Sequence, residues 1–319
     1  MLRRQDVGHR VVVRRIVGSA EDRPLYTDAL GELVELTETD LTLATAQGTL
    51  RVPLREVHRA KRVPAARRPP AVEVAALELA ADEAWPAPER ARLGDWILRA
   101  ADNWTGRANS ALAVGDPDRP LEAAIDAVVD WYRDRGQPPL ITAPMPLAAP
   151  VNAALDARGW TARPLVLVQT APLAAVLAAH ARDLPPVELA RAPAEDWFAM
   201  VAEHKGTLPP TARRLLTAVP EAVFAHVRND EGELIAVARG TVTGPQRWHG
   251  IALLQTAAGV RRRGLAAHVL RAMARWAADR GAARAYLQVE EHNAAAVALY
   301  QRLGFTTHHT YLTRELTGY

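Results

Sequence analysis

Cysteine is absent from all 319 residues of the sequence. Its absence excludes disulfide bonds, thiolate metal sites and a cysteine nucleophile. Lysine is almost as scarce, because Lys61 and Lys205 are the only two, and the basic residues are nearly all arginine. The formal net charge is only +3, and in a chain so rich in alanine and arginine it reflects coding bias as much as function. We therefore do not infer nucleic-acid binding from charge alone.

The sequence also lacks any apolar run long enough to span a membrane, although hydrophobic residues make up 49% of it. The chain does not open with the charged and then apolar segment typical of secreted proteins. We therefore expect a cytoplasmic protein with no membrane partner. A length of 319 residues is enough for two or three domains with ample hydrophobic core.

The first 64 residues predict a small all-β domain. We expect strands at residues 10–17, 29–36, 41–45 and 49–54, with a hairpin turn at 46–48. Short alternating strands at this spacing suggest a barrel similar to an SH3-like barrel. Such a barrel can bind a peptide or nucleic acid, but we favour a packing or dimerising module. Residues 1–68 carry a net charge of +4, and the remainder carries −1.

The rest of the chain alternates between helical and extended patterns, after a proline-rich linker at residues 65–71. Residues 72–170 predict helices at 74–84, 121–135 and 151–158 and a strand at 165–169. Residues 171–186 are expected to form a connector. Residues 187–319 predict helices at 196–205, 211–219 and 265–279, and strands at 222–228, 233–243, 248–256, 285–289 and 307–315.

Residues 249–269 are the most informative stretch, because a strand, a basic loop and a helix follow one another there. Ile251–Leu254 predicts a buried strand, and the apolar positions after Leu265 have helical spacing. The first N–H groups of a helix are unpaired and bind phosphate oxygens. Gly264 and Ala266 leave room for a pyrophosphate. Positive charge comes from Arg261, Arg262 and Arg263. The pattern alone is as typical of a solvated helix start.

The motif Arg261-x-x-Gly264-x-Ala266 after a strand resembles the acyl-CoA loop of the GNAT superfamily of N-acetyltransferases. The strand at residues 285–289 is followed by Asn293-x-x-Ala296-x-x-Leu299-Tyr300-x-x-x-Gly304-Phe305, which is similar to the second motif of that family. There a strand splays away and a helix carries Asn and Tyr towards the cofactor. The resemblance covers the C-terminal part of the chain. It implies an enzyme that transfers an acetyl group from acetyl-CoA to a primary amine.

The resemblance also implies roles for individual residues. Acetyl-CoA would contact Leu254, Gln255, Thr256, Arg261, Arg262, Arg263, Gly264, Leu265, Ala266 and Asn293, with the first three pairing their backbone with the pantetheine arm. Asn293 is alternatively only a helix N-cap. Tyr300 would be the general acid for the CoA sulfur, or else a core aromatic residue. The base is open between His249 and Glu290, or backbone carbonyls and water. No metal is expected, because Glu290, Glu291 and His292 alternate between faces of a strand.

An internal repeat is visible at an offset of 145 residues. Packing positions agree: Trp131 with Trp276, Asp134 with Asp279, Arg135-Gly136 with Arg280-Gly281, and Gly159-Trp160 with Gly304-Phe305. Positions assigned to chemistry differ: Arg119 replaces Gly264, Leu121 replaces Ala266, Ala148 replaces Asn293, and Leu155 replaces Tyr300. We therefore expect a mixed α+β protein with tandem GNAT folds, of which residues 72–170 are degenerate and 187–319 are active. Two acyl-CoA sites are the alternative.

Two rival functions remain open at this stage. One is a non-catalytic regulatory protein that binds acetyl-CoA and presents the N-terminal barrel to a partner. The other is a nucleic-acid-associated acetyltransferase that is tethered through that barrel. The acceptor can be a small molecule or an amine of a peptide or protein, and a homodimer is one open assembly. Acceptor pockets are built from variable loops, so these motifs do not distinguish among them.

Overall fold

The computed structural model describes residues 2–20, 23–45, 48–63, 69–178 and 184–317. The chain divides into two compact units, residues 1–68 and 69–319. Residues 65–68 of the predicted linker lie outside the described residues, and the first helix of the second unit already begins at Ala71. No helix among the described residues is long and apolar enough to cross a membrane.

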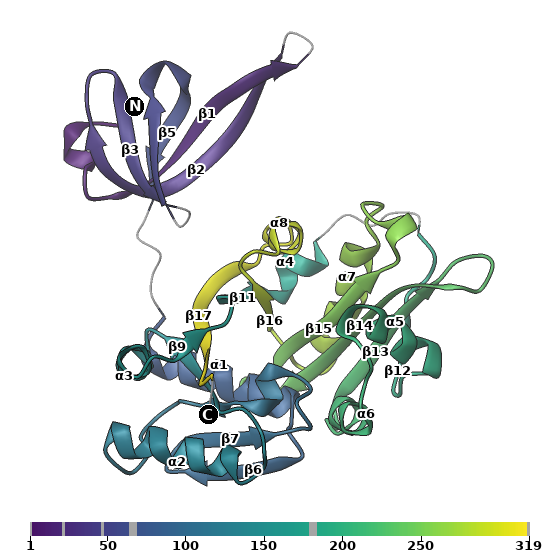
Figure 1. The fold of residues 1–319 in the computed structure, drawn as a ribbon. Helices are drawn as coiled ribbons and strands as arrows, with labels where there is room; N and C mark the ends of the chain where they lie inside the picture. The colour runs from purple at the N-terminus through teal and green to yellow at the C-terminus, as the bar shows by residue number, and fades with distance from the viewer. Residues whose placement is uncertain (1, 21–22, 46–47, 64–68, 179–183, 318–319) are drawn as a thin grey trace. The chain divides into compact units, whose positions relative to one another are not determined.

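The first unit is a five-stranded antiparallel sheet in the order β4-β3-β2-β1-β5 (Figure 1). Its strands are β1 (Arg10–Ala20), β2 (Arg23–Leu36), β3 (Asp40–Thr45), β4 (Gly48–Pro53) and β5 (Val57–Arg62). One face buries an apolar cluster that includes Val11, Val13, Leu33 and Leu43. No described residue of β4 pairs with β5, so the structure shows an open sheet where we expected a closed barrel. Two residues of the predicted turn, 46 and 47, lie outside the described residues.

The second unit is built on one twelve-stranded sheet in the order β12-β13-β14-β15-β16-β11-β17-β9-β8-β7-β6, with β10 paired to β17. Its strands are β6 (Glu89–Leu93), β7 (Trp96–Ala100), β8 (Ala111–Leu112), β9 (Leu140–Met145), β10 (Thr161–Ala162), β11 (Val166–Pro172), β12 (Glu188–Ala190), β13 (Ala222–Arg228), β14 (Leu234–Thr243), β15 (Trp248–Thr256), β16 (Arg284–Glu290) and β17 (Thr306–Glu315). The strands β6, β7, β8, β9, β10 and β12, like β5 of the first unit, were not predicted.

Among the described residues, eight α-helices cover this sheet. They are α1 (Ala71–Ala84), α2 (Leu121–Arg133), α3 (Ala149–Ala157), α4 (Leu173–Leu177), α5 (Glu195–Lys205), α6 (Pro210–Thr217), α7 (Leu265–Ala278) and α8 (Ala294–Arg302). The predicted connector at residues 171–186 begins too early, because β11 continues to Pro172 and α4 follows it directly. Leu173 and Val176 of α4 are buried in the core of the second copy, and residues 179–183 lie outside the described residues.

The two copies of the repeat exchange their last strands. The strand β11 belongs to the first copy but lies between β16 and β17. In return, the second half of β17 pairs with β9 and β10 of the first copy. Val166 pairs with Tyr311, two positions that are separated by the repeat offset. Residues 72–170 and 187–319 are therefore not separate bodies, because each copy receives a strand from the other.

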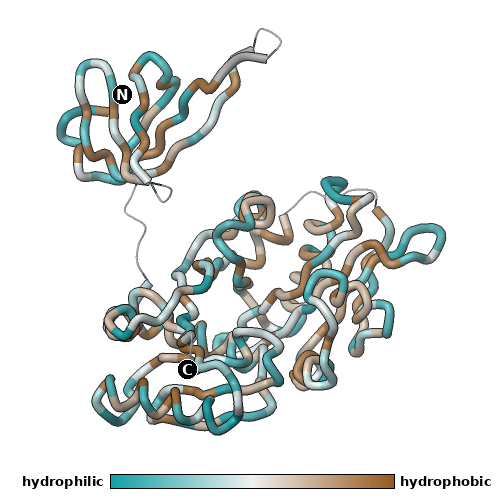
Figure 2. Tube along the Cα trace, in the orientation of Figure 1, coloured by the Kyte–Doolittle hydropathy of each residue, from teal (hydrophilic) through white to brown (hydrophobic). Residues whose placement is uncertain are grey.

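The two faces of the sheet have different covers around β14, β15 and β16. On the α1 face, Thr243 Oγ1 donates to the Ala80 carbonyl at 2.7 Å, and Arg239 Nη1 donates to the Ala84 carbonyl at 2.9 Å. On the α7 face, Val269 and Met273 of α7 are completely buried in the largest apolar cluster. Figure 2 shows that the central strands are among the most apolar parts of the chain. Strands buried on both faces read as continuous apolar runs.

Candidate active site

The strands β15 and β16 run parallel and then separate. Residues 249–251 pair with residues 285–287, although β15 continues to Thr256 and β16 continues to Glu290. Leu253 has a positive φ of 55°, and the register against β14 shifts at this point. The bulge bends β15, and beyond Ile251 no described strand pairs with its edge on the β16 side. This edge is a row of backbone groups available to a ligand.

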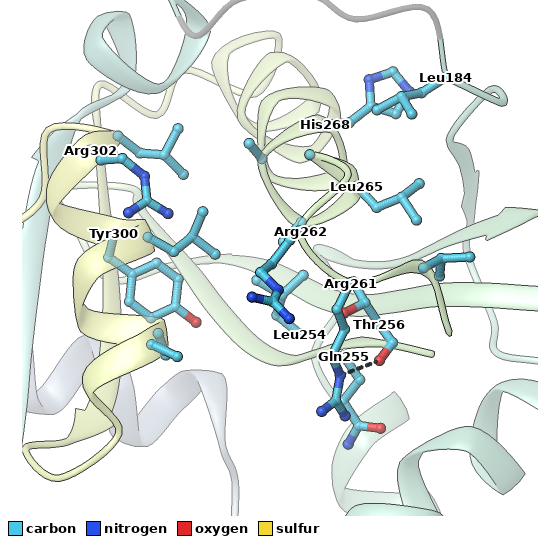
Figure 3. A pocket seen from close by; sticks show the side chains of 18 of the residues that line it. Leu184, Leu254, Gln255, Thr256, Arg261, Arg262, Leu265, His268, Tyr300 and Arg302 are labelled. Carbon is cyan, nitrogen blue, oxygen red and sulfur yellow. Dashed lines mark hydrogen bonds between the residues drawn. The ribbon is translucent and has the colours of Figure 1, made fainter. Parts of the chain in front are cut away.

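A cavity of about 920 Å³ lies at this opening, within the usual range for a ligand pocket. Figure 3 shows its walls coming from β15, from the loop before α7 and from α8. Ten of the residues predicted for the site line it: Leu254, Gln255, Thr256, Arg261, Arg262, Gly264, Leu265, Ala266, Asn293 and Tyr300. Arg263, His249 and Glu290 do not line it. The prediction missed other lining residues, among which are Ala175, Leu184, His204, His268 and Arg302.

The loop before α7 has the geometry of an anion site. Arg262 and Gly264 have positive φ values of 63° and 97°, and glycine adopts such a conformation at no steric cost. Gly264 is the N-cap of α7, a helix of 14 residues. Its carbonyl accepts from His268 N at 3.0 Å, so the N–H groups of the first turn before His268 have no partner within the helix. Arg261 Nε donates to the Thr256 carbonyl at 3.3 Å, which ties the loop to β15.

Tyr300 projects from α8 towards β15. Figure 3 shows its hydroxyl directed into the space between α8 and the loop before α7. Its side chain is 9% exposed, and its ring lies 5.8 Å from that of Phe305. Burial raises the pKa of Tyr300 to about 12, so the hydroxyl keeps its proton at neutral pH and can donate it. On the same helix, Asn293 Oδ1 accepts from Ala296 N at 3.2 Å, so Asn293 caps α8 as well as lining the cavity.

The two candidate bases lie on different faces of the sheet. His249 is completely buried on the α7 face, with Nδ1 3.1 Å from the Thr241 carbonyl. Burial lowers the pKa of His249 to about 4, so the ring is neutral at neutral pH. Glu290 is exposed, with Oε2 3.2 Å from His292 Nε2. It shares a side of β16 with Tyr286, which packs under α1. Glu290 is therefore on the α1 side of the sheet, whereas His249 is in the core on the α7 side.

We expect His249 to make the fold sensitive to acid. The unfolded histidine takes up a proton near pH 6.5, whereas the buried ring resists protonation until about pH 4. Between these values the unfolded state binds more protons, so stability falls as the pH falls, by roughly 3 kcal/mol at most. His249→Gln should flatten this part of the pH profile in urea unfolding. Burial also lowers the pKa of His308 to about 4. His308 contributes equally to the pH profiles of the unaltered protein and of His249→Gln, so it does not affect the comparison. Identical slopes in the two proteins would contradict the assignment.

Comparison with known proteins identifies the fold and the family. Residues 71–313 match the family described as "Probable histone acetyltransferase Rv0428c C-terminal". The chain belongs to this family. The Mycobacterium tuberculosis protein named probable histone acetyltransferase Rv0428c is 30% identical over 337 residues, covering 98% of this chain and 97% of the relative. The uncharacterized N-acetyltransferase YobR of Bacillus subtilis is 25% identical over 241 residues, covering 73% and 95%.

Solved structures share the fold of the second unit. A GCN5-related N-acetyltransferase from Kribbella flavida matches with a TM-score of 0.62 and 18% identity, covering 77% of this chain and 96% of that one. A conserved protein of unknown function from Staphylococcus epidermidis matches with a TM-score of 0.52 and 7% identity, covering 72% and 95%. With the family match, these findings make the chain a GNAT N-acetyltransferase, and this family implies acetyl-CoA as the cosubstrate.

The first copy of this GNAT protein has a different loop at the position that corresponds to the loop before α7. Its helix α2 begins after Pro120, which has no N–H group to offer. Asp116 N donates to Asp95 Oδ2 at 2.9 Å, and Asp118 N donates to Asp116 Oδ1 at 2.8 Å. These backbone amides, which a phosphate would need as donors, thus already donate to carboxylates of the protein. The negative charge of those carboxylates also repels an anion. Leu155, which replaces Tyr300, is completely buried.

Proposed function

We propose that this protein transfers an acetyl group from acetyl-CoA to a primary amine at the opening between β15 and β16, with Tyr300 as the general acid. The observation that carries the proposal is the open edge of β15 beside the start of α7, with a protonated tyrosine directed between them. The three features would bind the pantetheine arm, the pyrophosphate and the leaving sulfur.

The residues of the cavity fit acetyl-CoA in chemistry. Backbone amides at the start of α7 and the side chains of Arg261 and Arg262 offer donors and positive charge to phosphates. The backbone of residues 254–256 offers strand-like hydrogen bonds to the amide groups of pantetheine. Leu254, Leu265 and Leu299 add apolar surface for the rest of the arm. This donor set explains why a large cosubstrate needs few side chains.

The acceptor amine would approach the opening between β15 and β16 from the α1 face, where Gln255 also lines the cosubstrate cavity. Gln255 pairs with Val237, and Val237 packs in a cluster with Trp85 and Trp104 of the first copy. Ala252 and Leu253 of β15 contact the same cluster. The degenerate copy therefore supplies part of the surface beside the acceptor route, which gives it a function without chemistry of its own.

The reaction needs one proton to leave the amine and one to reach the sulfur. The amine nitrogen attacks the thioester carbonyl carbon, the C–S bond breaks, and Tyr300 protonates the departing thiolate. The amine proton passes to Glu290 or to water on the α1 face. We prefer Glu290 to His249, because His249 is enclosed on the other face. The name of the relative, a probable histone acetyltransferase, makes a lysine-containing histone peptide the first acceptor to test.

Calorimetric titration and an assay for released CoA thiol test this proposal together. We expect one acetyl-CoA per chain, because the first copy has lost the anion site, and thiol release that depends on an amine. Two sites per chain would contradict the degenerate copy. Tight binding without turnover over a panel of small amines, amino acids and histone peptides would favour the regulatory alternative. No binding at all would overturn the proposal.

A further inference from the structure

The first unit carries an exposed sheet face that its own core does not use. Strand alternation places Val11, Val13 and Leu33 on the buried face. The opposite face, which we call the outer face, includes Leu30 and Val34, which are 44% and 52% exposed. Figure 2 shows both polar and apolar residues along these strands. An exposed face of this composition is suited to binding.

The part of the sheet formed by β1 and β5 is rich in basic residues, of which Arg10, Arg14, Arg59 and Lys61 lie on the outer face by alternation and pairing. The strand β1 and the segment from Leu54 to Arg62 contain a single acidic residue, Glu56. The same two segments contain seven basic residues: Arg10, Arg14, Arg15, Arg55, Arg59, Lys61 and Arg62. Acidic residues lie on β2, in the loop after it and at the start of β3, namely Asp28, Glu32, Glu35, Glu38 and Asp40. Glu32 and Asp28 lie opposite Arg10 and Arg14 of β1, whereas β5 is at the edge of the sheet.

Pairing across β1 and β5 brings like charges together. Arg14 lies directly opposite Arg59, and Val12 lies opposite Lys61. Asp28 binds Arg14 through both carboxylate oxygens, at 2.8 and 2.9 Å. Among the described residues, no acidic side chain contacts Arg59 or Lys61. Like charges directly opposite one another destabilise a sheet, and an anion lying across the two strands would remove that repulsion.

An aromatic pair lies at the end of the same face. The rings of Tyr26 and His58 are 4.6 Å apart, and Tyr26 is 45% exposed. Tyr26 pairs with Ile16, two residues along β1 from Arg14, so its side chain is on the outer face. Exposed aromatic rings beside cations are typical of surfaces on which nucleic-acid bases stack.

We propose that the outer face of β1 and β5 binds nucleic acid, with Arg14, Arg59 and Lys61 at the phosphates and Tyr26 against a base. Arg59 and Lys61 are two residues apart on one strand, so their Cα atoms are about 7 Å apart. Such a row suits a polymer with regularly spaced charges. The aromatic pair favours nucleic acid over an acidic protein, which has no bases to stack. This inference does not depend on the acetyltransferase activity.

Fluorescence anisotropy of the full chain with labelled single-stranded and duplex DNA, at several salt concentrations, tests this surface. Arg59→Glu should weaken binding at least about tenfold at low salt. It should also lower the slope of log affinity against log salt by about 1 for the one lost phosphate contact. The matched control is Arg51→Glu, on β4 at the other edge of the sheet, where Arg51 pairs with Asp40 at 3.1 Å. Tyr26→Ala should weaken binding of single-stranded DNA more than binding of duplex DNA.

Three results would overturn the inference. One is no DNA binding at low salt, and another is an equal loss from Arg59→Glu and Arg51→Glu. The third is displacement of DNA by a polyglutamate peptide as efficiently as by unlabelled DNA, which would indicate an acidic protein partner. Circular dichroism of each variant checks that the unit remains folded. Acetyl-CoA titration should be unchanged in Arg59→Glu, so this test fails or succeeds independently of the enzyme proposal.

Discussion

Gly264→Glu is expected to abolish acetyl-CoA binding, with a loss of affinity of at least roughly 100-fold, or about 2.7 kcal/mol. Gly264 is the N-cap of α7 and lines the cavity. A glutamate there places a negative side chain where the amides and arginines would meet a pyrophosphate. Repulsion and the lost backbone approach act in the same direction. Calorimetric titration of both proteins with acetyl-CoA measures the effect.

Two controls separate charge from backbone strain in this experiment. Gly264 has a φ of 97°, so any side chain costs stability there, on the order of 1 kcal/mol. Gly264→Ala carries that strain without the charge and should retain measurable binding. Gly259→Glu puts the same charge in the same loop, at a glycine whose added Cβ meets no atom within 4 Å, and should bind nearly normally. If Gly259→Glu and Gly264→Glu lose affinity equally, the effect is general electrostatics and not a local pyrophosphate site.

Tyr300→Phe is expected to lower kcat by roughly 100-fold to 10,000-fold, the usual contribution of a positioned acid. The substitution removes one hydroxyl and keeps the ring that packs on Phe305, so acetyl-CoA affinity should change less than about twofold. Because burial raises the pKa of Tyr300 to about 12, its ionisation should not limit kcat below that pH. Steady-state kinetics over a pH series, with the acceptor found by the amine screen, make the measurement.

Tyr132→Phe is the matched control for this result. Tyr132 is a completely buried tyrosine of the first copy, and its hydroxyl donates to the Arg99 carbonyl at 2.8 Å. Its removal costs some stability but should leave kcat unchanged. A similar loss of kcat in both variants would point to a general structural effect. An unchanged kcat in Tyr300→Phe would remove the general-acid role and leave Tyr300 as a core aromatic residue.

Short-range patterns explain which parts of the site could be predicted. The strand, loop and helix around Gly264 follow one another within about twenty residues, and the helical and extended periods there are strong. Asn293 and Tyr300 follow on the next strand–helix pair, and both line the same cavity. Ala175 and Leu184 line it too, but they come from a segment that we assigned to a connector, and no local pattern marks such residues.

The placement of His249 and Gln255 shows where sequence reasoning fails. Strict alternation along a strand would put both on the same face, because their positions differ by six, an even number. The bulge at Leu253 shifts the register, so Gln255 pairs with Val237 on the α1 face, while His249 is buried on the α7 face. A bulge is set by pairing with the neighbouring strand, so the sequence of β15 alone does not reveal it.

The amino-acid sequence by itself determined the strands and helices around the candidate site, the motif that resembles an acyl-CoA loop, and the repeat, because helical periodicity and glycine conformation act over a few neighbouring residues. Only the tertiary structure decided that the two copies exchange strands, that no described residue of β4 pairs with β5 in the N-terminal sheet, and which candidate base faces which side. Those features depend on hydrogen bonds between residues such as Val166 and Tyr311. The sequences of these strands contain no feature that predicts pairing with a strand so distant along the chain.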